Sequence, residues 1–357
     1  ADALFVCTQD KDHREHAVLA MRAGYDICLE KPAAATWADC LEIYNEQQRT
    51  GKKVMICHVL RYTAAINKLK EVLDSGVIGK VVSIDQTENV VFWHEAHSYV
   101  RGNWRRSEDT TPMIMAKCCH DLDLIQYFIG AKCRSVSSMG SLFYFRKENK
   151  PEGAADRCTK CKYVRTCPYS AERIYVDMWK NEFGAPENAW PMNVITDELP
   201  LTEQNLHKAI EEGPYGRCVF ACDNDVVDNQ TTIMQFENGI TATLKMEAFV
   251  KNGGRDIRFF GSDGELSLHE GEDKIVLKRY FGEDKEWRIS DLTDDLEGHG
   301  GGDHRMLDKL YEILAEGNKQ VDTSIENSVE SHYMAIAAEE SRLKGGALVE
   351  LASYRKD

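Results

Sequence analysis

Lys31 lies where a lysine can do chemistry. It belongs to the tripeptide Glu30-Lys31-Pro32, which directly follows the apolar run of residues 25–29. If that run is a parallel strand, Lys31 projects into the crevice beyond the strand's carboxyl end, where α/β proteins bind ligands. There it could donate or accept a proton, or bind a substrate hydroxyl. The tripeptide alone leaves open a solvated lysine in an ordinary strand-to-helix turn.

A second chemical pattern is a group of closely spaced cysteines. Cys158, Cys161 and Cys167 lie in the polar segment 146–171, which has little apolar material to hold it folded. Thiolates at such spacing bind zinc, with an iron-sulfur cluster as the alternative and free thiols as the other interpretation. We expect these three cysteines to bind a metal, with Cys222 rather than Cys218 as the fourth ligand.

The elements that position Lys31 follow an alternating pattern. Apolar runs end near residues 8, 30 and 58, and helical patterns ending at residue 24 and covering 36–50 separate them. Such alternation predicts βαβ units and a parallel sheet whose strand ends share one edge. Another helix is predicted at about 63–75.

The second half has the period of two that is typical of half-covered strands. Its strand patterns fall within residues 81–93, 135–145, 227–249, 255–268 and 274–281, and its helical patterns at about 117–129, 303–317 and 324–344. We therefore predict α/β plus α+β classes. The C-terminal part of a Rossmann domain is followed by an open-faced, mostly antiparallel β-sheet domain with helices on one face. The expected boundaries are 1–62, 63–345 with the cysteine-rich insertion 146–171, and a C-terminal segment 346–357.

Composition narrows the class of partner. The formal net charge of −15 disfavours nucleic acid and anionic membranes. No apolar run reaches the roughly eighteen residues that a membrane-spanning helix needs. We expect a small-molecule partner and a cytoplasmic location, although an upstream export signal stays open. A homo-oligomer is also expected, because open sheet faces often serve as subunit interfaces.

A dinucleotide fold normally opens with a Gly-x-Gly-x-x-Gly turn, followed about twenty residues later by an acidic residue. Neither occurs at the start of this sequence, and the glycines of residues 298–302 follow no strand pattern. We therefore expect the first half of the Rossmann domain to precede Ala1.

The motifs "TQDKDH", "LEKP", "HVLRY" and "NWRRSEDTTPMIMAKCCHDLD", in this order, resemble the glucose-fructose oxidoreductase, inositol dehydrogenase and MocA-like (Gfo/Idh/MocA) family across essentially the whole chain. The resemblance implies NAD or NADP as cofactor, a sugar, inositol or related polyol as substrate, and Lys31 and His120 as catalytic residues. The positions expected to contact the cofactor are Thr8, Gln9, His13, Glu30, Lys31, Pro32 and Arg61.

The expected substrate contacts are Trp93, His94, Trp104, Arg105, Asp123, His299 and Asp303. Trp93 and His94 are included because aromatic faces and hydrogen-bonding rings suit polyols. Packing of that loop within its own domain is the alternative. His299 and Asp303 flank a glycine-rich stretch that can wrap a polar ligand, with Asp303 expected as a helix N-cap.

One position departs from the family pattern. Ala116 occupies the place, four residues before His120, where the family usually has an aspartate. We expect Lys117, on the same helical face as His120, or Asp121 to supply the replacement polar group. Lys117 is therefore counted among the catalytic candidates. Cys118 and Cys119 are interpreted as helix packing.

The predicted function is hydride transfer between NAD(P) and a hydroxyl of a sugar or polyol. His120 would move the hydroxyl proton, and Lys31 would stabilise the oxygen that carries it. One alternative is an NAD-dependent glycosidase or lyase that oxidises its sugar only transiently. The other is a non-catalytic sugar-binding or regulatory homologue.

Overall fold

The N-terminal sheet has the predicted βαβ arrangement. The computed structural model describes residues 1–295, 297–316 and 321–355. Strands β1 (Ala3–Val6), β2 (Asp26–Leu29) and β3 (Val54–Ile56) are parallel and adjacent in the order β1-β2-β3. Helices α1 (His13–Arg22) and α2 (Trp37–Thr50) connect them. The carboxyl ends of all three strands therefore share one edge.

The large sheet is mostly antiparallel, as predicted. Within the described residues its strands run in the order β11-β10-β9-β8-β4-β7-β6-β5-β12, and β4 and β7 pair in parallel. The strands are β4 (Val81–Val91), β5 (Cys133–Ser141), β6 (Asn229–Phe236), β7 (Thr241–Val250), β8 (Gly254–Gly261), β9 (Gly264–His269), β10 (Lys274–Arg279), β11 (Lys285–Arg288) and β12 (Val349–Glu350).

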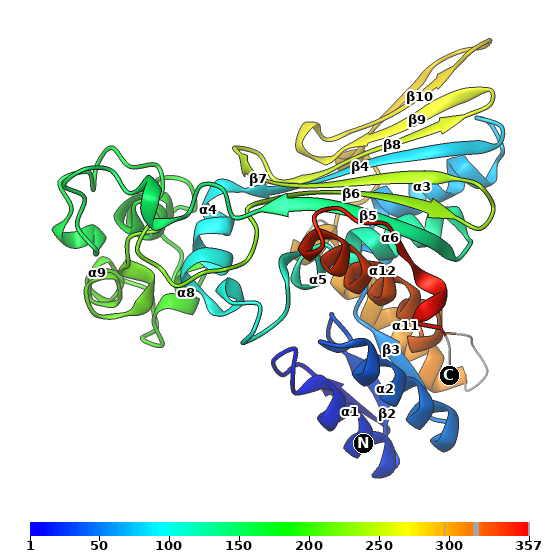
Figure 1. Cartoon of the computed structure of the whole chain (residues 1–357), viewed down its shortest axis with the longest axis horizontal. Coiled ribbons are helices and arrows are strands. Elements are labelled where there is room, and N and C mark those ends of the chain that lie inside the picture. The colour runs from blue at the N-terminus through cyan, green and yellow to red at the C-terminus, as the bar shows by residue number, and fades with distance from the viewer. Residues whose placement is uncertain (296, 317–320, 356–357) are drawn as a thin grey trace.

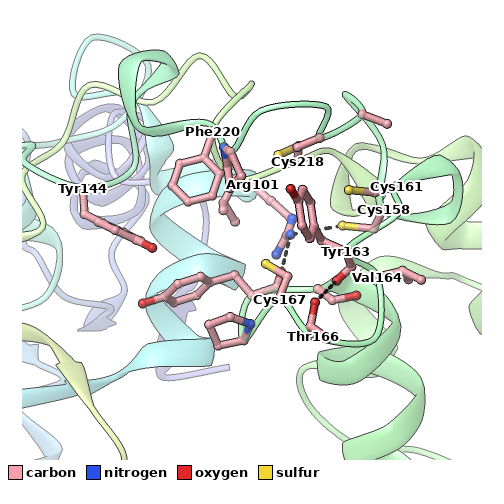
Figure 2. Close-up of a pocket in the computed structure, with 17 residues that line it drawn as sticks. Arg101, Tyr144, Cys158, Cys161, Tyr163, Val164, Thr166, Cys167, Cys218 and Phe220 are labelled. Atoms are coloured by element: carbon pink, nitrogen blue, oxygen red, sulfur yellow. Dashed lines mark hydrogen bonds between the residues drawn. The ribbon is translucent and has the colours of Figure 1, made fainter.

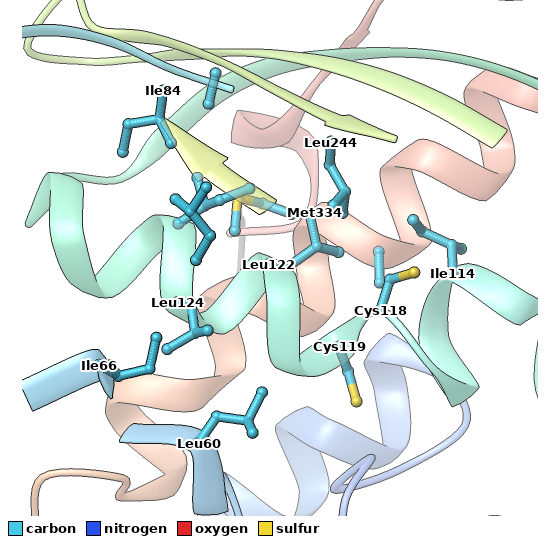
Figure 3. Packing of buried hydrophobic residues seen from close by; sticks show 14 of the residues in the cluster. Leu60, Ile66, Ile84, Ile114, Cys118, Cys119, Leu122, Leu124, Leu244 and Met334 are labelled. Atoms are coloured by element: carbon cyan, nitrogen blue, oxygen red, sulfur yellow. The ribbon is translucent and has the colours of Figure 1, made fainter. Parts of the chain in front are cut away.

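Helices cover one face of this sheet, below it in Figure 1. They are α3 (Ala64–Asp74), α6 (Cys119–Ile129) and α12 (Ile325–Leu343). Their apolar side chains form one core with the buried side chains of the strands, in which Leu122 of α6 lies near Met334 of α12 and Leu244 of β7 (Figure 3). Cys118 and Cys119 lie in this core as free thiols, so their interpretation as packing residues is confirmed.

A separate lobe was missed by the sequence analysis. Residues of the segment 142–222 form a second core, which also receives side chains from residues 92–100, directly after β4. The lobe's helices α7 (Met178–Asn181), α8 (Met192–Ile195) and α9 (Glu203–Glu212) lie beyond one end of the large sheet (Figure 1). Its buried side chains include Trp179 and Leu206. The expected insertion 146–171 is thus only part of a larger unit that has its own apolar core.

The C-terminal part of the chain returns to the first sheet. Helix α11 (Gly302–Glu316) follows α10 (Glu297–Gly300), and Ser324 pairs with Met55 of β3 and caps α12 by accepting from Asn327 N–H. His332 of α12 accepts a 2.8 Å hydrogen bond at Nε2 from the Ala33 amide. Helix α12 therefore joins the two sheets. Among the described residues, no helix is both long and apolar enough to cross a bilayer.

Candidate active site

His13 holds together the two strand ends expected to face the cofactor. Its Nδ1 lies 2.7 Å from the Pro32 carbonyl oxygen and its Nε2 lies 2.9 Å from the Thr8 carbonyl oxygen. The ring is buried, whereas Thr8 and Gln9 are exposed. Thr8, His13 and Pro32 are thus brought together at the carboxyl edge of the sheet, where His13 connects the segments that follow β1 and β2.

Lys31 leaves the end of β2 and reaches the second domain. Its Nζ donates a 3.1 Å hydrogen bond to the carbonyl oxygen of Ala116, the last residue of α5 (Met113–Ala116). Its backbone N–H donates to Glu30 Oε2 at 3.1 Å. A backbone carbonyl, available whatever the side chain, therefore orients the lysine at the position where the resemblance led us to look for a carboxylate.

His120 lies in the first turn of α6 and is 6% exposed. Its Nδ1 is buried and has no hydrogen-bond partner among the described residues. Burial, followed by the positive charge of Lys31, holds the pKa of His120 well below its usual range. The imidazole is consequently neutral near pH 7.

A second histidine, His58, was not among the predicted site residues. It follows β3, and its ring centroid lies 5.9 Å from that of His120. Burial lowers the pKa of His58 to about 3, although Asp123 opposes the shift from 3.6 Å away. Neither ring nitrogen has a hydrogen-bond partner among the residues that the structure describes. Its position just after the third parallel strand could have marked it as a site residue.

Arg61 and Asp123 bind each other. The guanidinium donates to both carboxylate oxygens, from Nε at 2.7 Å and from Nη2 at 2.6 Å. Asp123 is 1% exposed, and Arg61 also donates to the Asp322 carbonyl oxygen and lies over the Tyr127 ring. We expected Arg61 to contact the cofactor and Asp123 the substrate. In the structure the two side chains instead bind each other inside the protein, and this pair holds α6 against the turn after β3.

The prediction that Lys117 and His120 share one helical face is wrong. The chain turns at Lys117 and Cys118, between α5 and α6, because neither helix extends across these residues. Lys117 Nζ instead lies 3.2 Å from Glu88 Oε1 of β4. The expected replacement by Asp121 is not met either, since its Oδ1 accepts from Arg255 Nε at 2.8 Å and from Gln86 Nε2 at 2.7 Å, facing the large sheet.

Trp93 and His94 form an aromatic group with Trp190 from the lobe. The centroid of Trp190 lies 4.9 Å from that of His94 and 5.3 Å from that of Trp93. Burial lowers the pKa of His94 well below its usual range, and the charges of Lys117 and Lys31 add to the shift. Trp190 was missed because its segment has no strand or helix periodicity.

Of the remaining predicted substrate residues, His299 approaches His120, Asp303 contacts His299, and Trp104 and Arg105 are engaged elsewhere in the protein. His299 has its ring centroid 6.3 Å from that of His120, and its Nδ1 lies 3.0 Å from Asp303 Oδ2. Asp303 stands inside the first turn of α11 rather than at its N-cap. Trp104 packs against the main core, and Arg105 donates to both oxygens of Asp223 at 2.9 and 3.1 Å.

The chain matches two family profiles, one over the N-terminal sheet and one over the large-sheet part. Residues 1–58 match the NAD-binding Rossmann fold of the Gfo/Idh/MocA oxidoreductase family, and residues 70–351 match its C-terminal alpha/beta domain. The chain belongs to this oxidoreductase family. The resemblance seen in the sequence motifs is thereby confirmed, and so is the fold class.

The relatives of this chain carry the names of different activities. YteT of Bacillus subtilis, named as an oxidoreductase, is 22% identical over 87% of this chain and 72% of its own length. The 2,7-anhydro-N-acetylneuraminate hydratase of Mediterraneibacter gnavus is 27% identical, over 39% of this chain and 36% of its own. Inositol 2-dehydrogenase 2 of Saccharopolyspora erythraea is 28% identical, over 36% and 35%.

A solved structure shares the fold. Levoglucosan dehydrogenase, in complex with NADH and levoglucosan, superimposes with a TM-score of 0.66 over 98% of this chain and 80% of that one, at 16% identity. The residues of this Gfo/Idh/MocA chain are compatible with the NAD that the family's Rossmann domain binds. Three strand ends share one edge of the N-terminal sheet, and the buried Nδ1 of His120 has no hydrogen-bond partner among the residues that the structure describes. The strand-to-helix turns within residues 1–62 contain no Gly-x-Gly-x-x-Gly sequence for the pyrophosphate.

The cysteines gather around a cavity of about 190 Å³ in the lobe of this family member (Figure 2). Cys158, Cys161, Cys167 and Cys218 line it. Cys222, our expected fourth ligand, does not, because its thiol turns back to within 3.3 Å of the Cys218 carbonyl oxygen. Among the described residues, no three or more His, Cys, Asp or Glu side chains are already arranged to hold a metal ion.

Proposed function

We propose that this protein transfers a hydride between a nicotinamide cofactor, NAD or NADP, and a hydroxyl-bearing carbon of a sugar, inositol or related polyol. The observation that carries the proposal is the pairing of a buried neutral base, His120, with an oriented ammonium, Lys31, at the carboxyl edge of a parallel sheet. Membership of an oxidoreductase family with an NAD-binding domain supports it.

The cofactor, when bound, supplies the acceptor for the hydride. His120 takes the hydroxyl proton while the carbon–hydrogen bond breaks, and its neutral state makes this possible near neutral pH. The Lys31 ammonium stabilises the negative charge that develops on the substrate oxygen. Lys31 Nζ donates one hydrogen bond to the Ala116 carbonyl oxygen, and this bond fixes the directions of its remaining N–H bonds. The alcohol becomes a carbonyl group, and His120 passes its proton to water.

We assign substrate contact to the aromatic group of Trp93, His94 and Trp190. Indole rings pack against the carbon–hydrogen faces of sugars, and the neutral His94 can exchange hydrogen bonds with hydroxyls. The ring of His299 also lies near His120, and Asp303 contacts His299. The inositol and levoglucosan dehydrogenases among the relatives support a polyol or sugar as the substrate class.

The proposal is tested by adding NAD or NADP with a panel of inositols, hexoses and anhydrosugars, and recording the absorbance of the reduced nicotinamide. Formation of the reduced cofactor with at least one polyol supports the proposal. Turnover of simple aliphatic alcohols but of no polyol would contradict the assigned substrate class.

A second candidate is a lyase or hydratase that oxidises its sugar only transiently, favoured by the hydratase among the relatives. It predicts cleavage of a chromogenic glycoside, or hydration of an anhydrosugar, without net accumulation of reduced cofactor. Recording product and cofactor absorbance in the same sample separates the two candidates.

A further inference from the structure

Arg101 is a buried cation without a countercharge. It is 1% exposed, its Nε donates to the Arg217 carbonyl oxygen at 2.8 Å, and its Nη2 donates to the Tyr169 carbonyl oxygen at 2.7 Å. In the described part of the chain, Nη1 has no hydrogen-bond partner and no carboxylate forms an ion pair with the guanidinium. Burying an uncompensated charge is strongly unfavourable, so this arrangement calls for a negative group nearby.

Besides these two carbonyl oxygens, Arg101 lies beside a thiol. Arg101 lines the lobe cavity together with the four cysteines (Figure 2), and its Nη2 lies 3.7 Å from Cys158 Sγ. The Ala171 amide also points at this sulfur, from 3.4 Å. Two N–H groups are thus directed at one sulfur atom of the cavity wall.

The backbone places the fourth cysteine beside the first pair. Cys158 opens a 3-10 turn (Cys158–Lys160), and the Cys161 amide donates to the Cys158 carbonyl oxygen at 3.1 Å. Arg157 and Arg217 form an antiparallel bridge, and the Cys218 amide donates to the Asp156 carbonyl oxygen at 2.8 Å. Segments that are distant in sequence are thus fixed so that Cys158 and Cys218 line the same cavity.

We propose that Cys158, Cys161, Cys167 and Cys218 bind one zinc ion as four thiolates, with Arg101 balancing part of the charge. Four thiolates and Zn²⁺ carry a net charge of −2, which Arg101 reduces to −1. The side chains turn inward until each sulfur lies about 2.3 Å from the ion, and the thiol protons are released to solvent. Zinc has no redox chemistry here. It is a structural ion, separate from the hydride-transfer site.

The ion joins parts of a segment that contains little regular structure. Apart from the Arg157–Arg217 bridge, the regular structure of residues 146–170 consists of two short 3-10 turns, Lys147–Asn149 and Cys158–Lys160. This segment packs on the lobe core, and the lobe presents Trp190 to His94. Zinc binding therefore stabilises the part of the protein that carries one wall of the proposed substrate site.

The test is the metal content of the full chain purified without chelators, measured by inductively coupled plasma mass spectrometry. The proposal predicts about one zinc ion per chain. Cys158→Ser and Cys218→Ser should lose the ion, whereas the matched control Cys222→Ser should keep it. Protein that contains no zinc and takes up none when zinc is added under reducing conditions would overturn the proposal. So would iron with acid-labile sulfide, or zinc lost from Cys222→Ser but kept in Cys218→Ser.

A second measurement does not depend on whether the serine variants fold. Wild-type protein stripped of metal is titrated with cobalt(II), which should give thiolate charge-transfer bands and the visible bands of a tetrahedral site. Arg101→Met should weaken zinc affinity by about 10-fold to 100-fold, the usual effect of removing a group that supports metal ligands. Arg101→Lys, which keeps the charge, should lose less. Octahedral cobalt spectra, or equal affinities for all three proteins, would contradict the site.

Discussion

Lys31 Nζ donates its hydrogen bond to the backbone carbonyl oxygen of Ala116, at 3.1 Å and across 85 residues of sequence. This contact joins the end of β2 to the segment that leads into α6, and thereby to His120. A carbonyl oxygen orients the ammonium without neutralising it. The full charge of Lys31 therefore remains available to a substrate oxygen and to lower the proton affinity of His120.

Removing the ammonium should slow hydride transfer. We expect Lys31→Met to lower kcat by about 100-fold to 1,000-fold, the range found when one preorganised stabilising group is deleted. Lys80→Met, which changes an exposed lysine on the large-sheet domain, is the matched control. Steady-state rates with the best polyol of the panel provide the measurement, and equal loss in both variants would contradict a specific role for Lys31.

The low pKa of His120 fixes the shape of the pH profile. Because the folded pKa lies well below the usual 6.5, His120 is already unprotonated at neutral pH, and kcat/KM should not fall between neutral pH and the region just below 6.5. Activity should decline only on further acidification. His120→Gln should lose about 100-fold to 10,000-fold in kcat. A wild-type profile that halves near pH 6.5 would show that His120 is not held neutral by its surroundings.

The buried pair of Arg61 and Asp123 should matter far more for stability than an exposed pair of the same type. Asp123→Asn leaves the Arg61 charge buried and unpaired, so we expect the free energy of unfolding to fall by about 3–5 kcal/mol. Asp223→Asn breaks the exposed pair with Arg105 and should change it by less than about 1 kcal/mol. Urea unfolding of both variants measures the difference. Similar losses would mean that burial does not distinguish them.

His58 predicts a pH dependence of stability. Its folded pKa of about 3 lies below its usual 6.5, so below 6.5 the unfolded chain binds a proton that the folded protein does not. This contribution to stability is complete above pH 6.5 and is lost as the pH falls toward 3, by at most about 1.4 kcal/mol per pH unit. Unfolding free energies of wild type and His58→Asn across this window should converge as the pH falls. Parallel curves would exclude the assignment.

Trp190 should affect substrate binding more than chemistry. We expect Trp190→Ala to raise KM for the polyol several-fold while kcat changes little, because the ring contributes a contact surface and no proton transfer. Phe183→Ala, a change to another exposed aromatic residue of the same lobe, is the control. A fall in kcat with unchanged KM would argue against Trp190 as a substrate contact.

The elements that could be predicted from the sequence are those with local signals. Helices at Thr36, Thr63 and Ser324 begin where a hydroxyl side chain caps them, and each cap accepts the expected backbone hydrogen bond. The placement of Lys31 after a parallel strand rested on the same kind of local pattern.

Contacts between distant segments could not be predicted in this way. The turn at Lys117 interrupts a stretch with helical periodicity, and its partner Glu88 lies on β4, so tertiary contacts override local propensity there. The pairing of Arg61 with Asp123, the approach of Trp190 to His94 and the choice of Cys218 over Cys222 likewise depend on residues brought together only by folding.

The central claim is that a hydride moves from a polyol carbon to the nicotinamide, with His120 as the base. Its most direct test uses myo-inositol and glucose carrying deuterium on every carbon, with NAD or NADP, and NMR of the nicotinamide ring after turnover. We expect deuterium on the ring of the reduced cofactor from at least one of these substrates, and almost none in the same time with His120→Gln. Reduced cofactor without deuterium, or equal labelling by His120→Gln, would contradict it.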